Sequence, residues 1–174
     1  MGNTLVVDVS NFFFLVPMNP EMRERFLKSG GYLYMPPSPG NMWLICRLRA
    51  RFGRIVFFAQ GWDTKFFQIQ LLRWLKKYGL LIPGQESEVV VFKTQAEKGM
   101  WCKKHHVDVF VSDQWRPTAE VFSHSPQTLC YFLAPQFVLR DNVLRLWDTA
   151  QGVLPQGRIA AGPTWDSFFE YFPA

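Results

Sequence analysis

The sequence is poor in cysteine and contains no long uninterrupted apolar run. Its three cysteines, Cys46, Cys102 and Cys130, are widely separated and form no CxxC pair, which argues against a disulfide framework and against a structural zinc site. Charged residues or prolines interrupt each apolar stretch before the roughly 18 to 20 residues that a membrane-spanning helix needs. We therefore expect no transmembrane helix.

The first residues also lack the features of a secretory signal. No basic segment precedes the first apolar run, and Asp8 falls where a signal peptide would stay apolar. Unpaired thiols are typical of reducing compartments. We therefore expect a cytoplasmic protein.

What the chain does contain is typical of a globular protein. Its 174 residues are 48% hydrophobic and 19% charged, which suits a single domain over residues 1–174 with a sizeable core. The net charge of +5 comes from clusters of Lys and Arg, which favour a phosphorylated small molecule, a nucleotide, a nucleic acid or a protein as partner. The alternative is that these clusters are ordinary solvated helix faces.

Short β-branched runs alternate with amphipathic stretches along the chain. This alternation predicts an α/β fold with a doubly wound parallel sheet. The expected strands are Thr4–Val7, Arg54–Ala59, Glu88–Phe92, Val107–Ser112 and Thr128–Leu133. The expected helices are Asn41–Phe52, Asp63–Tyr78, Thr94–His105, Pro117–Phe122 and Pro163–Phe172.

One segment breaks the alternation. Residues 12–40 are rich in proline and glycine and show one short helical pattern near residues 21–27. Because this insertion follows the first strand directly, we expect it to lie over the carboxyl edge of the sheet as a lid. The alternative is an ordinary surface loop.

The first strand ends in a carboxylate. Asp8 follows the apolar run Leu5–Val7 and precedes the turn-forming residues Ser10 and Asn11. In parallel sheets, the carboxyl ends of strands hold catalytic and metal-binding side chains. Asp8 is therefore the first candidate for a functional residue, and the alternative is a carboxylate that accepts hydrogen bonds from loop amides.

Several further segments follow in a recognisable order, namely residues 5–11, 37–52, 54–59, 65–80, 89–93, 96–99 and 107–113. In this order and spacing the chain resembles the haloacid dehalogenase-like superfamily of phosphohydrolases, and in particular its small 5'-nucleotidase-like members. The resemblance covers nearly the whole chain. It implies a Rossmann-like sheet with a small lid, and a site for phosphoryl groups at the sheet edge.

The resemblance also implies roles for individual residues. Asp8 matches the nucleophile that attacks phosphorus, and Lys98 matches the lysine that holds the phosphoryl oxygens, with Lys93 as a substitute. Asp8 and Asp113 match the acids that hold Mg²⁺, the expected cofactor. Gln60 lies at the position of a second phosphate-binding side chain.

Three positions depart from the superfamily pattern. Ser10 occupies the general-acid position, Ala59 and Gln60 stand where a Ser or Thr is usual, and Ser112 replaces the first of two acids. Loss of a general acid alone lowers a rate by about 10² to 10⁴. We therefore expect a phosphohydrolase-like protein that binds a phosphorylated ligand or partner with little or no turnover, and the alternative is an active Mg²⁺-dependent phosphatase.

Other interpretations remain open from the sequence. The stretch around Asp8 also resembles the opening of the PIN and 5'-nuclease group, whose chemistry needs several converging carboxylates. The alternative for Lys98 is a solvated lysine on its helix. The alternative for Asp113 is a residue that begins the next helix. Trp62 is a candidate for stacking on a base, and packing at the rim of the core is its alternative.

Overall fold

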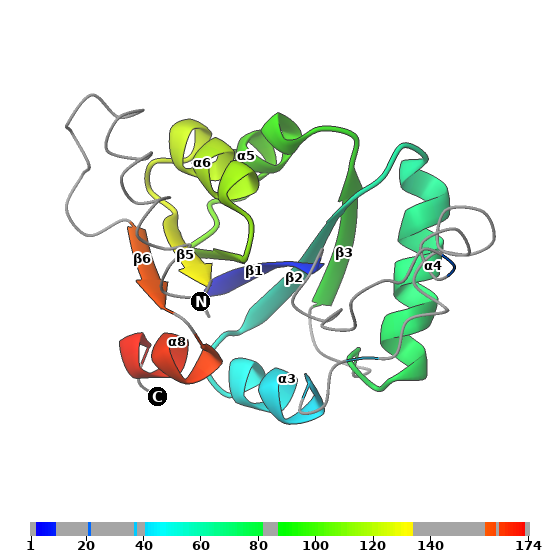
Figure 1. The fold of residues 1–174 in the computed structure, drawn as a ribbon, viewed down its shortest axis with the longest axis horizontal. Helices are drawn as coiled ribbons and strands as arrows, with labels where there is room; N and C mark the ends of the chain where they lie inside the picture. Colours follow the sequence, from blue (N-terminus) through cyan, green and yellow to red (C-terminus); the bar gives the residue numbers. More distant parts are fainter. Residues whose placement is uncertain are drawn as a thin grey trace.

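The computed structural model describes residues 3–9, 21, 37, 41–81, 87–133, 159–162 and 164–172. Within them, the strands of one sheet all pair in parallel, in the order β3-β2-β1-β4-β5-β6 (Figure 1). The strands are β1 (Thr4–Asp8), β2 (Arg54–Gln60), β3 (Ser87–Phe92), β4 (Val109–Ser112), β5 (Leu129–Leu133) and β6 (Ile159–Gly162). The helices are α3 (Asn41–Arg49), α4 (Thr64–Lys77), α5 (Gln95–Lys104), α6 (Trp115–His124) and α8 (Trp165–Tyr171). The doubly wound parallel sheet predicted from the sequence is therefore confirmed.

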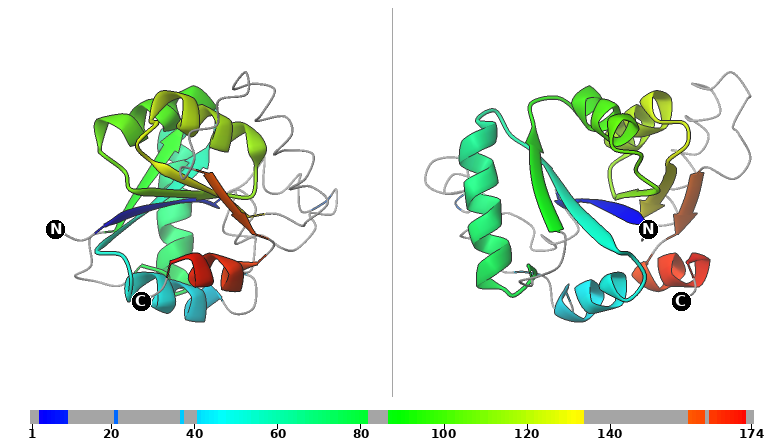
Figure 2. Two further views of the ribbon diagram at one scale, coloured as in Figure 1. Left: turned by 90° about the vertical axis from the view of Figure 1, so that its left-hand side faces the viewer. Right: turned by 180° about the vertical axis from the view of Figure 1, so that it is seen from behind.

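Helices cover both faces of the sheet, because alternate residues of each strand point to opposite sides. On one face, Leu5 and Val7 pack in a core with apolar residues of α3, α4 and α8. On the other, Val6 packs with Cys102 of α5 and Val121 of α6. Figure 2 shows α5 and α6 on one side of the sheet and α3 and α8 on the other. Since Asp8 shares the strand face of Val6, its side chain lies on the side of α5 and α6.

The sequence did not predict the sixth strand. Ile159–Gly162 pairs with β5 at the edge of the sheet, although Ala and Gly have low strand propensity. Gly162 allows a close approach there, since a Cβ at this position would lie 2.3 Å from the Tyr131 hydroxyl oxygen. Tertiary packing against β5 therefore outweighs the weak local preference.

The helix ends follow the sequence signals closely. Thr94 and Glu97 form the capping box expected at the start of α5. Gly79 closes α4 with a φ of 67°, the left-handed conformation that glycine adopts without strain. The expected Pro117 helix is longer than predicted, because α6 begins at Trp115 and places Pro117 within its first turn.

Two predictions about the chain as a whole are not tested by these elements. Apart from Glu21 and Pro37, the expected lid of residues 12–40 lies outside the described residues. A single domain over residues 1–174 also stays a prediction. No helix in the described ranges combines the length and the apolar character needed to cross a bilayer.

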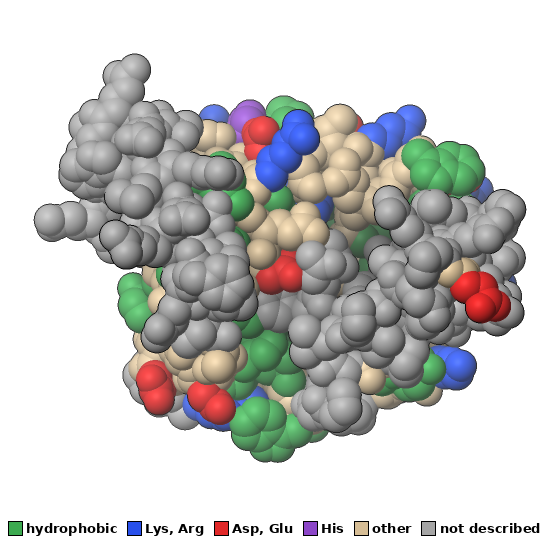
Figure 3. All heavy atoms as spheres, viewed as in Figure 1, with side chains coloured by type: hydrophobic (Ala, Val, Ile, Leu, Met, Phe, Trp, Pro, Cys, Tyr) green, Lys and Arg blue, Asp and Glu red, His purple; other side chains and the backbone are tan. Residues whose placement is uncertain are grey.

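Helices α5 and α6 pack very closely at Gly99. A Cβ at this position would lie 2.4 Å from the backbone oxygen of Glu120 and 2.9 Å from Cβ of His124. Because the nearest obstacle is backbone, a larger residue would force the two helices apart. The outer surface of this helix pair carries charged side chains (Figure 3).

We predict that Gly99→Ala lowers the free energy of unfolding by about 1 to 3 kcal/mol, although Ala favours a helix, because overpacking outweighs helix propensity. Met100→Ala is the matched control, since Met100 is exposed on the same helix, and it should change stability by less than about 0.5 kcal/mol. Urea denaturation followed by circular dichroism measures both. Equal stability of Gly99→Ala and wild type would contradict the close packing.

Candidate functional site

The candidate site lies where the strand order of the sheet reverses. Chain connections run from β1 outward to β2 and β3 on one side, and from β4 outward to β5 and β6 on the other. In open α/β sheets, ligands bind at the carboxyl ends of the strands at this switch point. Val7 of β1 pairs with Val111 of β4, so Asp8 and Ser112 are the next residues on these two neighbouring strands.

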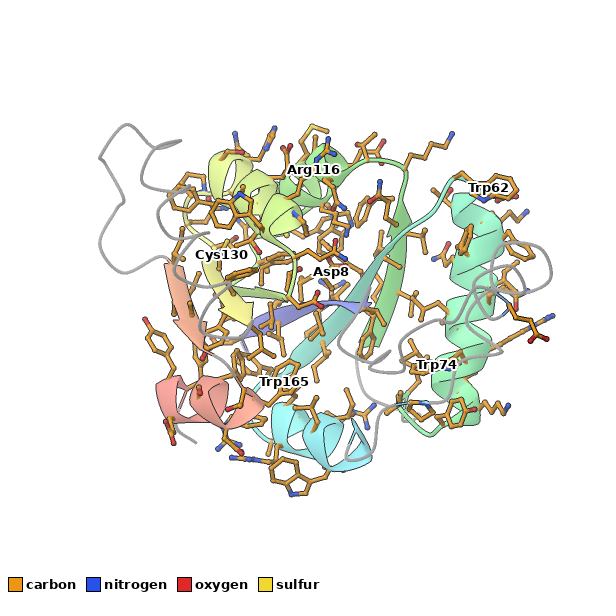
Figure 4. All side chains as sticks on the ribbon, in the orientation of Figure 1. Asp8, Trp62, Trp74, Arg116, Cys130 and Trp165 are labelled. Carbon is orange, nitrogen blue, oxygen red and sulfur yellow. The ribbon has the colours of Figure 1, made fainter. Side chains whose placement is uncertain are left out.

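Asp8 is held by a buried lysine. The ammonium nitrogen Nζ of Lys98 lies 3.0 Å from Oδ1 and 2.9 Å from Oδ2 of Asp8, so it contacts both carboxylate oxygens. Both side chains are fully buried, and Figure 4 shows Asp8 at the centre of the molecule. Burial of two charges is costly unless they are paired with good geometry. Each side chain therefore depends on the other for its place in the fold.

The start of α5 determines where Lys98 lies. Thr94 accepts a hydrogen bond from the Glu97 backbone, and Glu97 Oε2 accepts one from the Thr94 amide. The same carboxylate oxygen accepts a bond from the amide of Lys93, 2.8 Å away. Through these bonds Glu97, the residue before Lys98, attaches the start of α5 to the end of β3. Together with the close packing at Gly99, they place the lysine over the end of β1.

Ser112 connects the ion pair to α6. Its hydroxyl donates a hydrogen bond to Asp8 Oδ2 (3.3 Å) and accepts one from the backbone amide of Gln114 (3.1 Å). Thr118 then donates to the Gln114 carbonyl oxygen (2.8 Å). Sequence reasoning treated Ser112 as a missing acid and gave it no role. Its position at the end of β4, next to the strand of Asp8, is the signal that would have identified it.

Two predicted substrate-binding residues lie at the carboxyl ends of the next strands along this edge, Gln60 as the last residue of β2 and Lys93 directly after β3. Gln60 donates from its amide nitrogen to the Lys93 carbonyl oxygen (2.9 Å), and its amide oxygen accepts a bond from Gln95 (2.6 Å). Both ends of the Gln60 side chain are therefore engaged within the protein. The structure places Lys93 beside Gln60, with Lys93 exposed.

The remaining candidates are distributed differently. Asp113 directly follows Ser112 at the same edge and is half-buried. Trp62 is 72% exposed near the N-terminal end of α4, where its ring packs edge-on against Phe67, and Figure 4 shows it well away from Asp8. Ser10 lies outside the described residues. The site thus brings together Asp8, Lys98 and Ser112, with Asp113 adjacent.

The donor set limits how a metal ion would bind. In the part of the chain that the structure describes, no three His, Cys, Asp or Glu side chains gather as a ligand group. Mg²⁺ is commonly held by one or two carboxylates together with phosphate oxygens of the substrate. Asp8 at the end of β1 and Asp113 just after β4 are the carboxylates that the resemblance assigned to Mg²⁺, and both oxygens of Asp8 already contact Lys98.

Two buried cysteines, Cys102 and Cys130, lie in the core on the same side of the sheet as the pair of Asp8 and Lys98. Cys102 follows Lys98 by one helical turn, and burial together with the nearby Cys130 raises the pKa of its thiol. Burial raises the pKa of Cys130 to about 12. Because the thiolate is the reactive form, both side chains act as small apolar groups that fill the space beneath the site.

Comparison with known proteins assigns no family to this arrangement. No model of a known protein family matches the chain, and no curated protein sequence matches it significantly.

We predict that removal of either charge of the buried pair is strongly destabilising. Asp8→Asn and Lys98→Met should each lower the free energy of unfolding by about 3 to 5 kcal/mol, because each leaves the other charge buried without its partner. The double variant should lose less than the sum of the two single losses, since it leaves no isolated charge. Urea denaturation of all four proteins measures this coupling.

The exposed ion pair of Arg47 and Asp166 is a control for this cycle. Their nitrogen and oxygen lie 3.1 Å apart, and the Asp166 side chain is 73% exposed. Asp166→Asn should therefore cost at most about 1 kcal/mol. Additive losses at Asp8 and Lys98, of a size similar to that of Asp166→Asn, would show that the two buried charges are not coupled.

We also predict that the native protein has one fast-reacting thiol. Cys46 is exposed, whereas Cys102 and Cys130 are buried with raised thiol pKa values. Ellman's reagent should therefore titrate Cys46 quickly, and should reach the other two thiols only in denaturant. A Cys46→Ser variant with no fast phase would assign the reaction. Rapid modification of three thiols in the native protein would contradict the closed packing beneath Lys98.

Proposed function

We propose that this chain is a haloacid dehalogenase-like protein that binds a phosphorylated ligand at the Asp8 site, with little or no turnover. The observation that supports it best is the contact of Lys98 with both carboxylate oxygens of Asp8 at the switch point of the sheet. Asp8 ends β1 and Lys98 lies near the start of α5, as expected for a nucleophile and a phosphate-binding lysine of that superfamily.

The groups around Asp8 are suited to holding a phosphate. An ammonium group neutralises the charge of phosphoryl oxygens, and a hydroxyl donates a hydrogen bond to them. Lys98 and Ser112 supply these two groups. Both Asp8 and Lys98 are fully buried, so binding has to include a rearrangement around the pair.

The same groups are poorly suited to turnover. Ser112 supplies a hydroxyl where a second acid would help to hold Mg²⁺, and Ser10 supplies a hydroxyl where a carboxylic acid would protonate the leaving oxygen. Ala59 is buried and has no hydroxyl, and the Gln60 amide is engaged with Lys93 and Gln95. The geometry therefore favours recognition of a phosphate over its transfer.

A Mg²⁺-dependent phosphatase is the second candidate function. It is favoured by the contact of Lys98 with Asp8, and by the place of Asp8 and Asp113 at the carboxyl ends of the neighbouring strands β1 and β4. In that case Asp8 and Asp113 would hold the ion, which would neutralise charge on the phosphoryl oxygens. Phosphate release in the presence of Mg²⁺ distinguishes this function from binding alone.

We predict that orthophosphate and AMP stabilise the wild-type protein against heat, by about 2.7 kcal/mol when the ligand concentration is 100 times Kd. Ser112→Ala should reduce this stabilisation because it removes a hydrogen-bond donor. Asp8→Asn should increase the stabilisation that the ligand produces, since it removes the carboxylate that competes with phosphate for Lys98. Lys76→Ala, which removes an exposed charge at the end of α4, is the control and should respond as wild type does. Differential scanning calorimetry measures each shift with and without ligand.

A parallel assay of phosphate release tests turnover. A panel of phosphomonoesters with Mg²⁺ should give no more release with wild type than with Asp8→Asn. Release that disappears in Asp8→Asn would instead establish the phosphatase. If neither ligand stabilises the protein and no phosphate is released, both functions are wrong, and cleavage of a labelled oligonucleotide with Mn²⁺ would show a nuclease.

A further inference from the structure

Helices α4 and α5 end with the same backbone turn, but a glycine takes the left-handed position in α4 and a histidine takes it in α5. Both carry two lysines followed by a two-residue turn, in residues 76–80 and 103–107. Both close with a backbone bond from the last of these residues to the carbonyl oxygen five positions earlier, of 2.8 Å to Leu75 and 3.1 Å to Cys102. The residue before the donor of this bond is Gly79 in α4 and His106 in α5.

His106 adopts a conformation that suits glycine. Its φ is 50°, and among the described residues no other non-glycine residue has a positive φ. A side chain with a Cβ is disfavoured there, and Gly79 shows that the same turn forms with glycine. A residue kept in a strained conformation at the surface is a reason to look for a function nearby.

His106 lines an open groove beside the C-terminal ends of α5 and α6. The groove has a volume of about 890 Å³, and its lining includes Met100, Lys103 and Lys104 from α5, and Ser123 and His124 from α6. Figure 3 shows Lys, Arg and His side chains gathered over these helices. The groove is separate from the Asp8 site, which uses the opposite side of α5.

The groove is positively charged and largely unneutralised. Lys103 and Lys104 are exposed, and in the described part of the chain neither ammonium group has a carboxylate partner. Among the described residues that line the groove there is no Asp or Glu, and the carboxylate of Glu120 lies 3.6 Å from Nδ1 of the lining residue His124. Two lysine charges therefore remain available to an anionic partner.

Helix electrostatics account for only part of this pattern. Lysines in a last turn interact favourably with the helix dipole, which explains them in α4 and α5 alike. The dipole does not explain His106 in a glycine conformation, and it does not explain why Met100 is 51% exposed beside the lysines. These two features belong to the groove and have no counterpart at the end of α4.

We propose that this groove binds an acidic segment of a protein partner. Carboxylates of the segment would pair with Lys103 and Lys104, the imidazole of His106 would donate a hydrogen bond, and an apolar side chain would cover Met100. Methionine adapts to the shapes of different side chains, which suits a peptide. A single-stranded nucleic acid is less favoured, because the described residues of the lining include no Phe, Tyr or Trp on which bases would stack.

The test compares two equal changes of charge at two similar helix ends. The probe is a fluorescent peptide of Asp and Glu residues with one central Leu, and its binding is measured by anisotropy at low and moderate salt. Lys103→Ala with Lys104→Ala should weaken binding about tenfold. Lys76→Ala with Lys77→Ala makes the same change at the end of α4 and should leave the affinity within about twofold of wild type.

His106→Gly separates binding from stability. Because glycine relieves the strained conformation, the melting temperature should rise by about 1 to 3 °C, while the peptide should bind about threefold more weakly. A structural role alone would raise stability without changing the affinity. Each variant's circular dichroism spectrum and melting curve verify that it is folded.

Several results would overturn the proposal. The proposal is wrong if wild type binds the peptide no better than a neutral peptide of the same length. It is also wrong if loss of the α4 lysine pair weakens binding as much as loss of the α5 pair, because that result would show unspecific attraction. An oligonucleotide of the same charge that binds more tightly through Lys103 and Lys104 would show a nucleic-acid surface instead. An unchanged affinity in His106→Gly would remove the role of that residue.

Discussion

The buried pair of Asp8 and Lys98 is the interaction on which the arrangement of this protein depends. The pair joins the end of β1 to the second turn of α5, over a sequence separation of 90 residues. Both charges are buried away from water, and burial of either charge without the other would lower the stability of the fold. Ser112 supplies a third polar contact from β4. The central strands and α5 are therefore kept in one register by electrostatics as well as by apolar packing.

The second constraint is the close packing of α5 against α6 at Gly99, the residue after Lys98. The helix reaches Asp8 with Lys98 on its inner side, while Gly99 lets α6 approach its backbone. The outer side of the same helix presents Met100 and Lys103 to the groove. One helix of ten residues thus contributes to the buried Asp8 site and to an exposed surface of positive charge. The two are chemically separate because they lie on different sides of the helix.

Much of the fold was predictable because its signals are local. Alternating apolar runs and helical stripes located five strands within two residues of their observed bounds, and the capping box of Thr94 and Glu97 located the start of α5. The strand Ile159–Gly162 was missed because its pairing with β5 depends on a distant partner. In the site, Asp8 was proposed from its place at the end of the first strand and Lys98 from the resemblance to a known pattern, whereas the contact of Ser112 with Asp8 was not predicted.

By itself, the sequence determined most of the helices and strands, the parallel sheet and the carboxylate at the end of the first strand, because these depend on the period of apolar residues and on short-range caps. Only the tertiary structure decided which charges meet. It brought Lys98 to both oxygens of Asp8, engaged Gln60 with Lys93 and Gln95, and left Trp62 exposed. It also revealed that His106 takes the conformation of a glycine. Such contacts depend on how separate helices and strands pack against one another. The spacing of residues along the chain does not predict that packing.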